Sequence, residues 1–388
     1  MSDKMRPIPF WKMLDWILEE YQKDRSIFGV PAEKFHFPRS RKSLELFGQP
    51  LSLPLGPAAG PHTQLAQNIV ASYLAGGRFI ELKTVQILDQ LEFPKPCIAA
   101  GEECYNTEWS TELAIEEALE EYIKAWFLLH ILQRELGQNS QRDFVFNMSV
   151  GYDLQGIQSP KVDSLIEGLK DASTLALWKE YQSILRENAR RFQSIDEEYI
   201  ESISPYLCNS VTLSTMHGCP PAEIEGISKY LLREKKLHTF IKMNPTLLGY
   251  QYVQETFDRM GYDQIQIKEE SFTRDLQYRD GADMLERLKK FARNEGQEFG
   301  VKLSNTLPVI ITGNQLPGDE MYMSGKALYP LTINLALKLA GEFDGDLPIS
   351  YSGGADFFNL PGLLETGIRP VTVASTLLKS GGYLRLKQ

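Results

Sequence analysis

The stretch Leu53–Gln86, LPLGPAAGPHTQLAQNIVASYLAGGRFIELKTVQ, contains the pattern that decides the fold. A short apolar run stops at GPAAGP, residues 56–61, where no side chain is larger than a methyl group or a proline ring. A helical pattern follows, and a second apolar run at residues 78–82 ends on Lys83 and Thr84. The order strand, turn, helix, strand predicts a βαβ unit with two parallel strands.

The turn after the first apolar run allows a ligand to approach closely. Ala58, Ala59 and Gly60 leave the backbone bare, so that a planar group can lie against it. Lys83 stands at the carboxyl end of the second strand, where sheets of this kind bind their ligands. A tight turn beside a surface lysine is the alternative, and it loses weight because lysines recur near the ends of later strands.

Composition excludes several classes of protein. The chain of 388 residues is 43% hydrophobic, which is enough to bury one large core or two smaller ones. Its formal net charge of −10 argues against a nucleic-acid surface, which needs a basic stripe. No uninterrupted apolar run approaches membrane-spanning length, and the first residues lack the apolar core of a signal peptide. The four cysteines have no Cys-x-x-Cys spacing. We therefore predict no metal site in this chain and a reduced, cytoplasmic protein.

The chain divides into an amino-terminal extension and a larger unit. Residues 1–50 form the extension, with a helical pattern at residues 10–18 and one arm of a hairpin at residues 43–47. Such a hairpin would plug the bottom of a barrel. We expect residues 51–388 to form that barrel, with a charged helical insertion at about 159–204, because this segment separates two strands by far more than one crossover requires.

Strand-like and helical segments alternate along the larger unit, and nine of them resemble strands: residues 51–55, 78–82, 143–149, 209–214, 238–245, 264–267, 299–306, 349–354 and 371–376. This alternation predicts a (β/α)8 TIM barrel. A barrel needs eight strands, so either residues 264–267 or residues 299–304 lie outside it. A doubly wound open sheet is the second choice, because the sequence lacks a Gly-x-Gly-x-x-Gly turn.

The last two strands end in residues that suit a phosphate group. In TIM barrels the loops after strands seven and eight commonly bind phosphate through exposed backbone N–H groups. Glycines let the backbone approach phosphate oxygens, and hydroxyl groups add donors. The residues that we expect at this position are Ser352, Gly353, Gly354, Ser375 and Thr376.

The segments GPAAGPHTQLAQNIV and GGRFIELKTVQ resemble the amino-terminal part of the bacterial YgfK family, whose members are named as candidate selenate reductase subunits. The resemblance spans nearly the whole chain. More broadly, the segments are similar to the FMN barrels of dihydroorotate and dihydropyrimidine dehydrogenases, in which a small-residue turn lies under FMN. The segment SGKALYPL, residues 324–331, also resembles the Ser-Gly-x-Ala-x-x-Pro of those barrels.

This resemblance implies a dihydroorotate dehydrogenase-like barrel that binds FMN non-covalently at the carboxyl ends of its strands. It assigns Ala58, Ala59 and Gly60 to the flavin ring and the two late turns to its phosphate. A lysine near the flavin N1 atom stabilises the anionic reduced ring. We favour a ligand role for Lys83 and leave the position of the second lysine open between Lys242 and Lys302.

The resemblance also implies substrate contacts. A carboxamide offers both a donor and an acceptor, which suits a pyrimidine-like ring with alternating N–H and C=O groups. Asn106 and the pair Asn305-Thr306 match substrate positions of the dehydrogenases. Asn147 matches less well, and a structural cap is an equal alternative for it.

The fourth strand departs from the dehydrogenases. Their motif Asn-Leu-Ser-Cys-Pro, followed by Asn or His, contains the cysteine that transfers a proton. Here Thr212 stands in place of the leading asparagine, and the resemblance makes it a substrate contact. Thr215 occupies the catalytic position of the cysteine, but its hydroxyl is too weak an acid for unaided transfer at neutral pH. The nearest titratable side chains are His217, our first choice as the general acid, and Cys219, our second. The absence of any general acid is the remaining alternative.

Three functions fit these residues. The first is an FMN-dependent oxidoreductase that exchanges hydride with an organic, pyrimidine- or purine-related, small-molecule substrate. The second is a catalytically degenerate barrel that serves as an assembly module of a redox complex. The third is an aldolase-type barrel with a Schiff-base lysine.

The first function needs further redox centres. Because no NAD(P) motif or cluster ligand set is visible, we expect iron–sulfur clusters and FAD/NADPH on other domains or subunits. YgfK-like chains normally continue into such parts, so this chain is expected to be a barrel-only piece or a stand-alone homologue. The sequence also leaves open whether the chain forms a homodimer.

Overall fold

The computed structural model describes residues 5–37, 43–101, 103–107, 109–137 and 142–388. Eight parallel strands curl into a nearly closed barrel: β5 (Leu55–Pro57), β6 (Phe79–Glu81), β9 (Val145–Gly151), β10 (Ser210–Ser214), β11 (His238–Met243), β12 (Phe299–Leu303), β15 (Ile349–Tyr351) and β16 (Val371–Val373). Their order is β5-β16-β15-β12-β11-β10-β9-β6, and each neighbouring pair runs parallel. The predicted (β/α)8 barrel is confirmed.

The barrel closes where β5 meets β6, without a regular ladder between these two strands. The N–H of Arg78 donates to the carbonyl oxygen of Leu55 at 2.8 Å. A Cβ on Gly56 would stand only 1.8 Å from the carbonyl oxygen of Phe79. The two backbones can approach this closely only because residue 56 has no side chain.

The ninth strand candidate, residues 264–267, is not a strand in the structure. It runs beside a second sheet, where the N–H of Ile310 donates to the carbonyl oxygen of Gln266 at 2.8 Å. Residues Phe299–Leu303 are β12, which pairs with β11 and β15 inside the barrel. The alternative that the sequence left open is thereby resolved.

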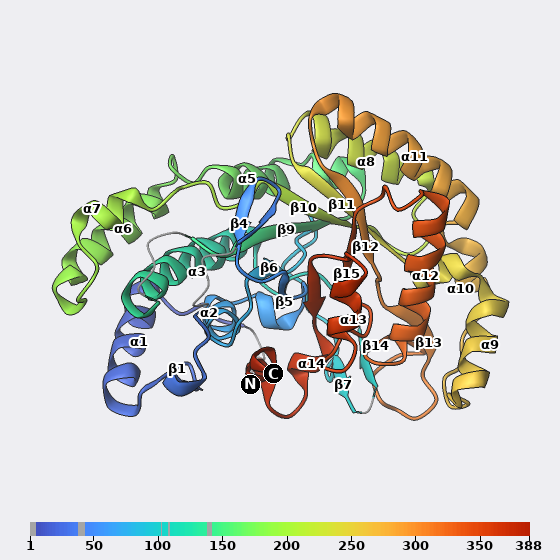
Figure 1. Ribbon diagram of the computed structural model, residues 1–388, viewed down its shortest axis with the longest axis horizontal. Coiled ribbons are helices and arrows are strands. Elements are labelled where there is room, and N and C mark those ends of the chain that lie inside the picture. Colours follow the sequence, from blue (N-terminus) through green and yellow to red (C-terminus); the bar gives the residue numbers. More distant parts are fainter. Residues whose placement is uncertain (1–4, 38–42, 102, 108, 138–141) are drawn as a thin grey trace.

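Helices surround the barrel and cover the outer face of its sheet (Figure 1). The α-helices of the described residues are α1 (Phe10–Asp24), α2 (Ala66–Leu74), α3 (Ile115–Leu136), α4 (Leu154–Ile157), α5 (Pro160–Lys170), α6 (Ala176–Asn188), α7 (Glu197–Ser202), α8 (Pro221–Arg233), α9 (Tyr250–Met260), α10 (Glu269–Arg274), α11 (Tyr278–Glu295), α12 (Leu328–Glu342), α13 (Leu360–Glu365) and α14 (Ser375–Leu378). Short 3-10 turns are η1 (Ala32–Lys34), η2 (Pro61–Thr63), η3 (Ala189–Arg191), η4 (Pro245–Leu248) and η5 (Gly382–Lys387).

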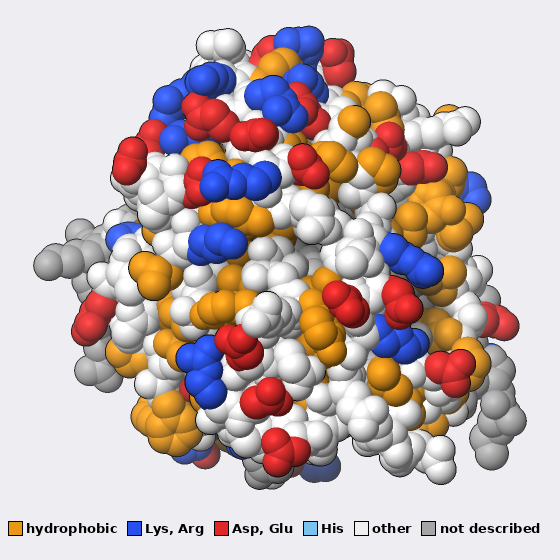
Figure 2. Space-filling view, turned by 90° about the vertical axis from the view of Figure 1, so that its right-hand side faces the viewer, with side chains coloured by type: hydrophobic (Ala, Val, Ile, Leu, Met, Phe, Trp, Pro, Cys, Tyr) orange, Lys and Arg blue, Asp and Glu red, His pale blue; other side chains and the backbone are white. Residues whose placement is uncertain are grey.

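The helices are held on the barrel by their apolar faces. On α11, Met284, Leu285 and Leu288 are fully buried. The outer face of the same side of the molecule carries Lys and Arg next to Asp and Glu (Figure 2). Exposed ion pairs such as Lys290 with Glu286, at 3.1 Å, contribute less than about 1 kcal/mol each.

The amino-terminal extension contacts both the helices and the base of the barrel. It contains α1 and two antiparallel pairs, β1 (Ser26–Ile27) with β2 (Val30–Pro31) and β3 (Leu44–Leu46) with β4 (Gln49–Leu51). At the turn between β3 and β4, the ring of Phe47 is buried with Phe79, Val145 and Phe240, which belong to three barrel strands. The hairpin therefore fills the amino-terminal end of the barrel.

The segment predicted as a helical insertion, residues 159–204, forms α5, α6, η3 and α7. Figure 1 shows α6 and α7 at the edge of the molecule, outside α3. Trp178 and Tyr181 of α6 are buried, and both rings contact Phe127 of α3.

A second, antiparallel sheet was not predicted. Its order is β13-β14-β8-β7, with bounds β7 (Ile98–Ala100), β8 (Cys104–Asn106), β13 (Leu307–Ile310) and β14 (Glu320–Ser324). It joins the connection after β6 to the connection after β12, and both connections leave the carboxyl ends of barrel strands. No helix in the described parts of the chain combines the length and the apolar character needed to cross a membrane.

Candidate active site

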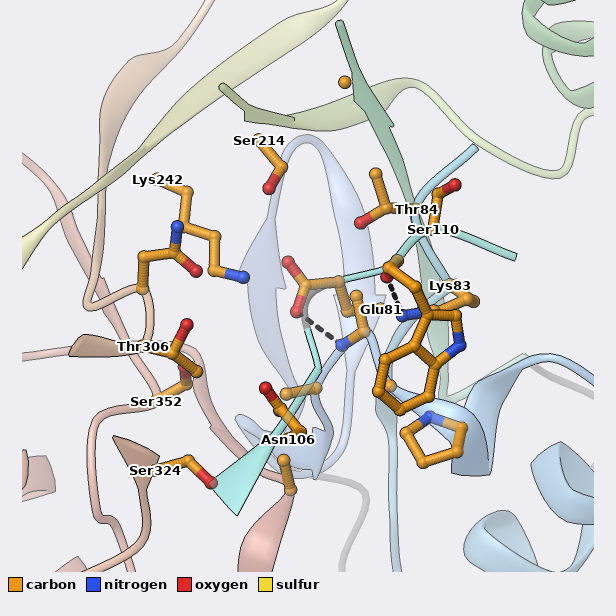
Figure 3. Close-up of a pocket in the computed structure, with 18 of the residues that line it drawn as sticks. Glu81, Lys83, Thr84, Asn106, Ser110, Ser214, Lys242, Thr306, Ser324 and Ser352 are labelled. Carbon is orange, nitrogen blue, oxygen red and sulfur yellow. Dashed lines mark hydrogen bonds between the residues drawn. The ribbon is translucent and has the colours of Figure 1, made fainter. Parts of the chain in front are cut away.

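A cavity of about 300 Å³ lies at the carboxyl ends of the barrel strands. Side chains from the barrel and from the second sheet point into it (Figure 3). Its volume is at the lower end of the range of small-molecule sites. Predicted site residues that line it are Ala58, Ala59, Gly60, Lys83, Asn106, Thr215, Lys242, Lys302, Asn305, Thr306, Ser352, Gly353, Gly354 and Ser375.

The bare turn after β5 lines one side of the cavity and is fixed by two hydrogen bonds. The N–H of Ala58 donates to the carbonyl oxygen of Val373 at 2.9 Å, and the N–H of Ala59 donates to Glu81 Oε2 at 2.9 Å. A Cβ on Gly60 would lie 2.6 Å from Cε1 of His62. The small residues therefore allow close packing against His62 and also leave a surface open to the cavity.

Glu81, which was not among the predicted site residues, forms a buried ion pair with Lys302 beside the cavity. Lys302 Nζ donates to Glu81 Oε2 and, at 2.9 Å, to Thr372 Oγ1. Burial alone would raise the pKa of Glu81, but the positive charges of Lys302 and Lys242 and its hydrogen bonds lower it overall. Burial lowers the pKa of Lys302, and the charge of Glu81 offsets part of that effect.

The ammonium group of Lys83 is directed at Trp109. Lys83 Nζ donates to the carbonyl oxygen of Trp109 at 2.6 Å and lies 4.6 Å from the centre of its ring. The hydroxyl group of Tyr122 donates to the carbonyl oxygen of Lys83 at 3.0 Å. Lys83 is only 6% exposed, so its charge lies in the wall of the cavity and stays away from bulk water.

Lys242 contributes a further charge from the end of β11. Its side chain extends into the cavity toward Glu81 (Figure 3). Lys242 and Lys302 both line the cavity but have different surroundings. Lys302 is paired with Glu81, while Lys242 reaches the open space.

The late turns lie at another side of the cavity. A Cβ on Gly353 would stand 2.0 Å from Thr332 Oγ1, and Gly354 has a φ of +74°, so neither position accepts a side chain without strain. Ser324 Oγ and Ser375 Oγ are 2.8 Å apart, which joins β14 to the start of α14. Thr376 does not line the cavity, because its hydroxyl donates to the carbonyl oxygen of Ala355.

Two side chains at the cavity have buried N–H groups without a partner among the described residues. One is Nδ2 of Asn305, which is 3% exposed, and the other is Nε1 of Trp109. An unpaired buried donor costs about 1–3 kcal/mol, which a ligand acceptor can recover. Both residues line the cavity, so the donors support a ligand site there.

The other predicted substrate residues, Asn147 and Thr212, lie in the barrel core instead. Asn147 Nδ2 donates to Thr212 Oγ1 at 2.9 Å, and Ser210 Oγ donates to Asn147 Oδ1 at 2.8 Å. Neither residue lines the cavity. Their polar groups satisfy one another between β9 and β10.

The loop after β10 brings Thr215 and Met216 to the cavity and leaves His217 and Cys219 outside it. His217 Nδ1 lies 3.0 Å from Asp275 Oδ2. Burial would raise the pKa of Asp275, but its contacts with His217, Thr246 and the Gly218 N–H bring it down to about 2. This carboxylate therefore holds the loop by several hydrogen bonds.

Cys219 is half-buried beyond the same loop. Burial raises the pKa of its thiol to about 11, and nearby carboxylates add to that effect. At neutral pH the group is a protonated thiol that does not face the cavity.

A second titratable group missed in the sequence lies behind the cavity wall. Ser110 lines the cavity, and its hydroxyl donates to Asp89 Oδ1. The N–H of Gln86 donates to Asp89 Oδ2 at 2.9 Å. Burial raises the pKa of Asp89 to about 7, although its hydrogen bonds and the charge of Lys83 oppose that change. Asp89 stands between Ile87-Leu88 and Gln90-Leu91, and this acidic residue in a mostly apolar run after β6 was the available signal.

The fold and the cavity define a TIM-barrel domain with a ligand site at the carboxyl ends of its strands, and comparison with known proteins gives its family, an oxidoreductase domain. The description "Oxidoreductase YgfK, N-terminal TIM-barrel domain" matches residues 28–388, and the chain belongs to this family. YgfK of Escherichia coli strain K12, named as a candidate oxidoreductase, is 52% identical over 398 residues, and so is YgfK of Escherichia coli O157:H7. The chain is covered completely but spans only 39% of the length of these two relatives.

Solved structures give the same fold. Ligand-free DHODH from Eimeria tenella matches with a TM-score of 0.55 and 14% identity, covering 97% of this chain and 92% of that one. DHODH from Eimeria tenella in complex with ferulenol matches with a TM-score of 0.53 and 14% identity, covering 99% and 90%. At this identity the likeness supports the barrel architecture alone.

Proposed function

We propose that this barrel binds FMN non-covalently and is the catalytic module of a larger oxidoreductase. Bound in the cavity, FMN would supply hydride exchange at its N5 atom. The observation that carries the proposal is the position of the bare turn, the double-glycine turn and the lysines around one cavity. The resemblance of these same segments to flavin barrels gives the cofactor.

The residues present fit the parts of that cofactor. The backbone of Ala58–Gly60 offers a flat surface for the ring, and the turn at Gly353 and Gly354 lines the cavity, where the N–H of Gly354 would meet phosphate oxygens. The N–H of Gly353 donates to the carbonyl oxygen of Leu303 at 3.3 Å. Lys83 and Lys242 place positive charge in the cavity wall, which stabilises an anionic reduced ring. The buried Glu81 carboxylate fixes the turn through Ala59.

The substrate proposal rests on the carboxamides. Asn106 and Asn305 line the cavity together with Thr306, and Asn305 holds an unused N–H donor. These groups suit a pyrimidine- or purine-related ring, whose edge alternates donors and acceptors. Asn147 and Thr212 are withdrawn from this set, because they bond to each other in the core.

Protonation of the substrate needs an acid that can reach the cavity. Thr215 reaches the cavity but is a weak acid, whereas His217 is turned toward Asp275. His217 can serve as the general acid only if the loop after β10 turns it inward. Asp89, through the hydroxyl of Ser110, is an acid whose hydrogen-bonded neighbour already lines the cavity.

The length of the relatives supports a larger assembly. Because this chain corresponds to 39% of YgfK, we propose that electrons pass between the barrel and iron–sulfur and FAD/NADPH-binding domains or subunits in the cytoplasm. Selenate reduction would be an activity of that whole assembly. A Schiff-base aldolase is less well supported, because Lys302 is engaged by Glu81 and Lys83 by Trp109, which leaves Lys242 as its remaining candidate. An assembly module without chemistry is less well supported, because the two turns and the lysines surround one cavity.

The experiment is to purify the chain, supplement it with FMN and remove the excess. Bound flavin should appear in the absorbance spectrum, and the melting temperature should rise. Linkage gives about 3 kcal/mol of added stability at a hundredfold excess over the dissociation constant. Neither bound flavin nor a melting shift would overturn the proposal, and trapping of a carbonyl ligand by borohydride would favour the aldolase.

A further inference from the structure

A second cavity, of about 640 Å³, lies at the opposite end of the barrel from the candidate active site. Arg142 precedes β9, Asn209 precedes β10, and Lys236 precedes β11, so the cavity opens at the amino-terminal ends of three neighbouring strands. Residues of α7 and of the hairpin strand β4 complete it. We call it the basal cavity.

The charges of the basal cavity have one sign. Its described lining includes Arg142, Lys170 and Lys236 and no Asp or Glu. Lys170 pairs with Glu167 at 3.0 Å and Lys236 with Glu295 at 3.1 Å, and both carboxylates lie outside the lining. These lysines and acids are partly exposed, so the pairs are weak and either lysine can turn to another anion.

Arg142 is the central group. Its guanidinium lies 5.1 Å from the ring centre of Trp126, and its Nη2 donates to Gln49 Oε1 at 2.6 Å. No carboxylate of the described residues pairs with it. A guanidinium has five N–H donors, and the structure supplies an acceptor for one of them within the described parts of the chain.

Arg142 is half-buried, and this partial burial makes its charge costly. Burial lowers the pKa of Arg142, and burial together with the charge of Arg142 lowers the pKa of the neighbouring His130 to about 3. A buried charge normally has a counter-ion, because desolvation costs several kcal/mol. His130 is neutral at physiological pH, so the excess positive charge at this site comes from Arg142 and the two lysines.

We propose that the basal cavity binds a small organic anion through a phosphate or carboxylate group seated on Arg142. The planar guanidinium can donate two parallel hydrogen bonds to such a group. Lys170 and Lys236 lie in the same lining to meet further negative charge, and the volume accommodates a metabolite-sized molecule. The site lies at the amino-terminal ends of the strands, the face of a TIM barrel that contributes to stability. The bound anion therefore stabilises the fold and takes no part in the chemistry.

The test is the melting temperature of the FMN-supplemented chain in sodium chloride, in sodium pyrophosphate and in sodium citrate, at matched ionic strength. Matching is needed because salt alone screens surface charges. Pyrophosphate tests whether the site binds a phosphate group, and citrate tests whether it binds a carboxylate group. We expect at least one of them to raise the melting temperature of the wild type, and calorimetry to show saturable binding.

Three variants locate the effect. Arg142→Gln should weaken binding about tenfold or more, the size expected for loss of a charged hydrogen bond. Arg190→Gln removes an exposed arginine outside the basal cavity and should leave the anion-induced rise in melting temperature unchanged. Gly354→Asp alters the late turn of the active-site cavity and should also retain the anion-induced rise in melting temperature.

No binding of either anion to the wild type, or undiminished binding to Arg142→Gln, would overturn the proposal. A purely structural Arg142 would lower the melting temperature and leave the anion-induced shift intact. Should Arg142→Gln fail to fold, the double variant Lys170→Gln with Lys236→Gln tests the same site. Undiminished anion binding in that variant would also overturn it.

Discussion

Glu81 and Lys302 pair across the interior of the barrel, from the end of β6 to β12, with side chains only 1% and 2% exposed. The same carboxylate accepts the N–H of Ala59, and the same ammonium group donates to Thr372. One ion pair thus connects the bare turn to β12 and to β16.

Glu81→Gln should therefore destabilise the chain strongly. Removing the carboxylate leaves the ammonium of Lys302 buried and unpaired, which typically costs about 3–5 kcal/mol. Urea unfolding checks the value. The matched control is Glu286→Gln, because Glu286 pairs with Lys290 on the surface of α11 and its loss should cost less than about 1 kcal/mol. Equal losses in the two variants would contradict the structural importance of the buried pair.

Lys83 and Gly354 should affect bound flavin in different ways. Lys83→Met should retain FMN and make its two-electron potential more negative, because a positive charge beside the reduced ring is lost. Gly354→Asp should release FMN, since it places a carboxylate at the proposed phosphate position and a side chain at a φ of +74°. Spectroelectrochemistry and flavin content separate the two effects. Loss of flavin from Lys83→Met with an unchanged potential would refute this division.

His217 should matter for proton transfer and leave flavin content unchanged. Once a substrate is known, His217→Gln should slow the oxidation of reduced flavin by that substrate in stopped-flow measurements. Cys219→Ser should have a smaller effect, because the Cys219 thiol has its pKa raised to about 11 and lies outside the cavity. Equal rates in wild type and both variants would assign the proton to solvent or to the hydroxyl of Ser110.

Asp89 should make stability fall as the pH rises toward neutrality. Burial raises its pKa in the folded chain to about 7 from an ordinary value of 3.8. Between these two values the folded state binds a proton that the unfolded state has lost, so the free energy of unfolding declines from about pH 4 to pH 7. Asp89→Asn should flatten this decline in urea titrations at several pH values. An identical pH profile in the variant would show that Asp89 titrates normally.

The barrel could be predicted because its signals are local. The small-residue turn at 56–61, the apolar strands and the helical patterns each occupy a few neighbouring residues. The number of strands was uncertain because residues 264–267 have strand-like composition, and their position beside β13 depends on a long-range contact. The second sheet was missed for the same reason, since β8 pairs with β14 more than two hundred residues away.

The site was only partly predictable. Residues at strand ends, such as Lys83 and Asn305, line the cavity because strand direction alone determines their position. Glu81 was missed because its partner, Lys302, is 221 residues distant. The direction of His217 depends on Asp275, which is 58 residues away, and no pattern around His217 indicates this contact.

The line of contact between β5 and β6 lacks a regular ladder, and the bare turn and Lys83 follow directly from these two strands. A ligand that touches Ala59 and Lys83 would therefore bridge the two edges that backbone pairing leaves unjoined. Occupancy of the cavity and closure of the barrel are then a single coupled equilibrium. In the ligand-free chain, the amide proton of Arg78, which donates to the carbonyl oxygen of Leu55, reports on this coupling through its exchange with solvent.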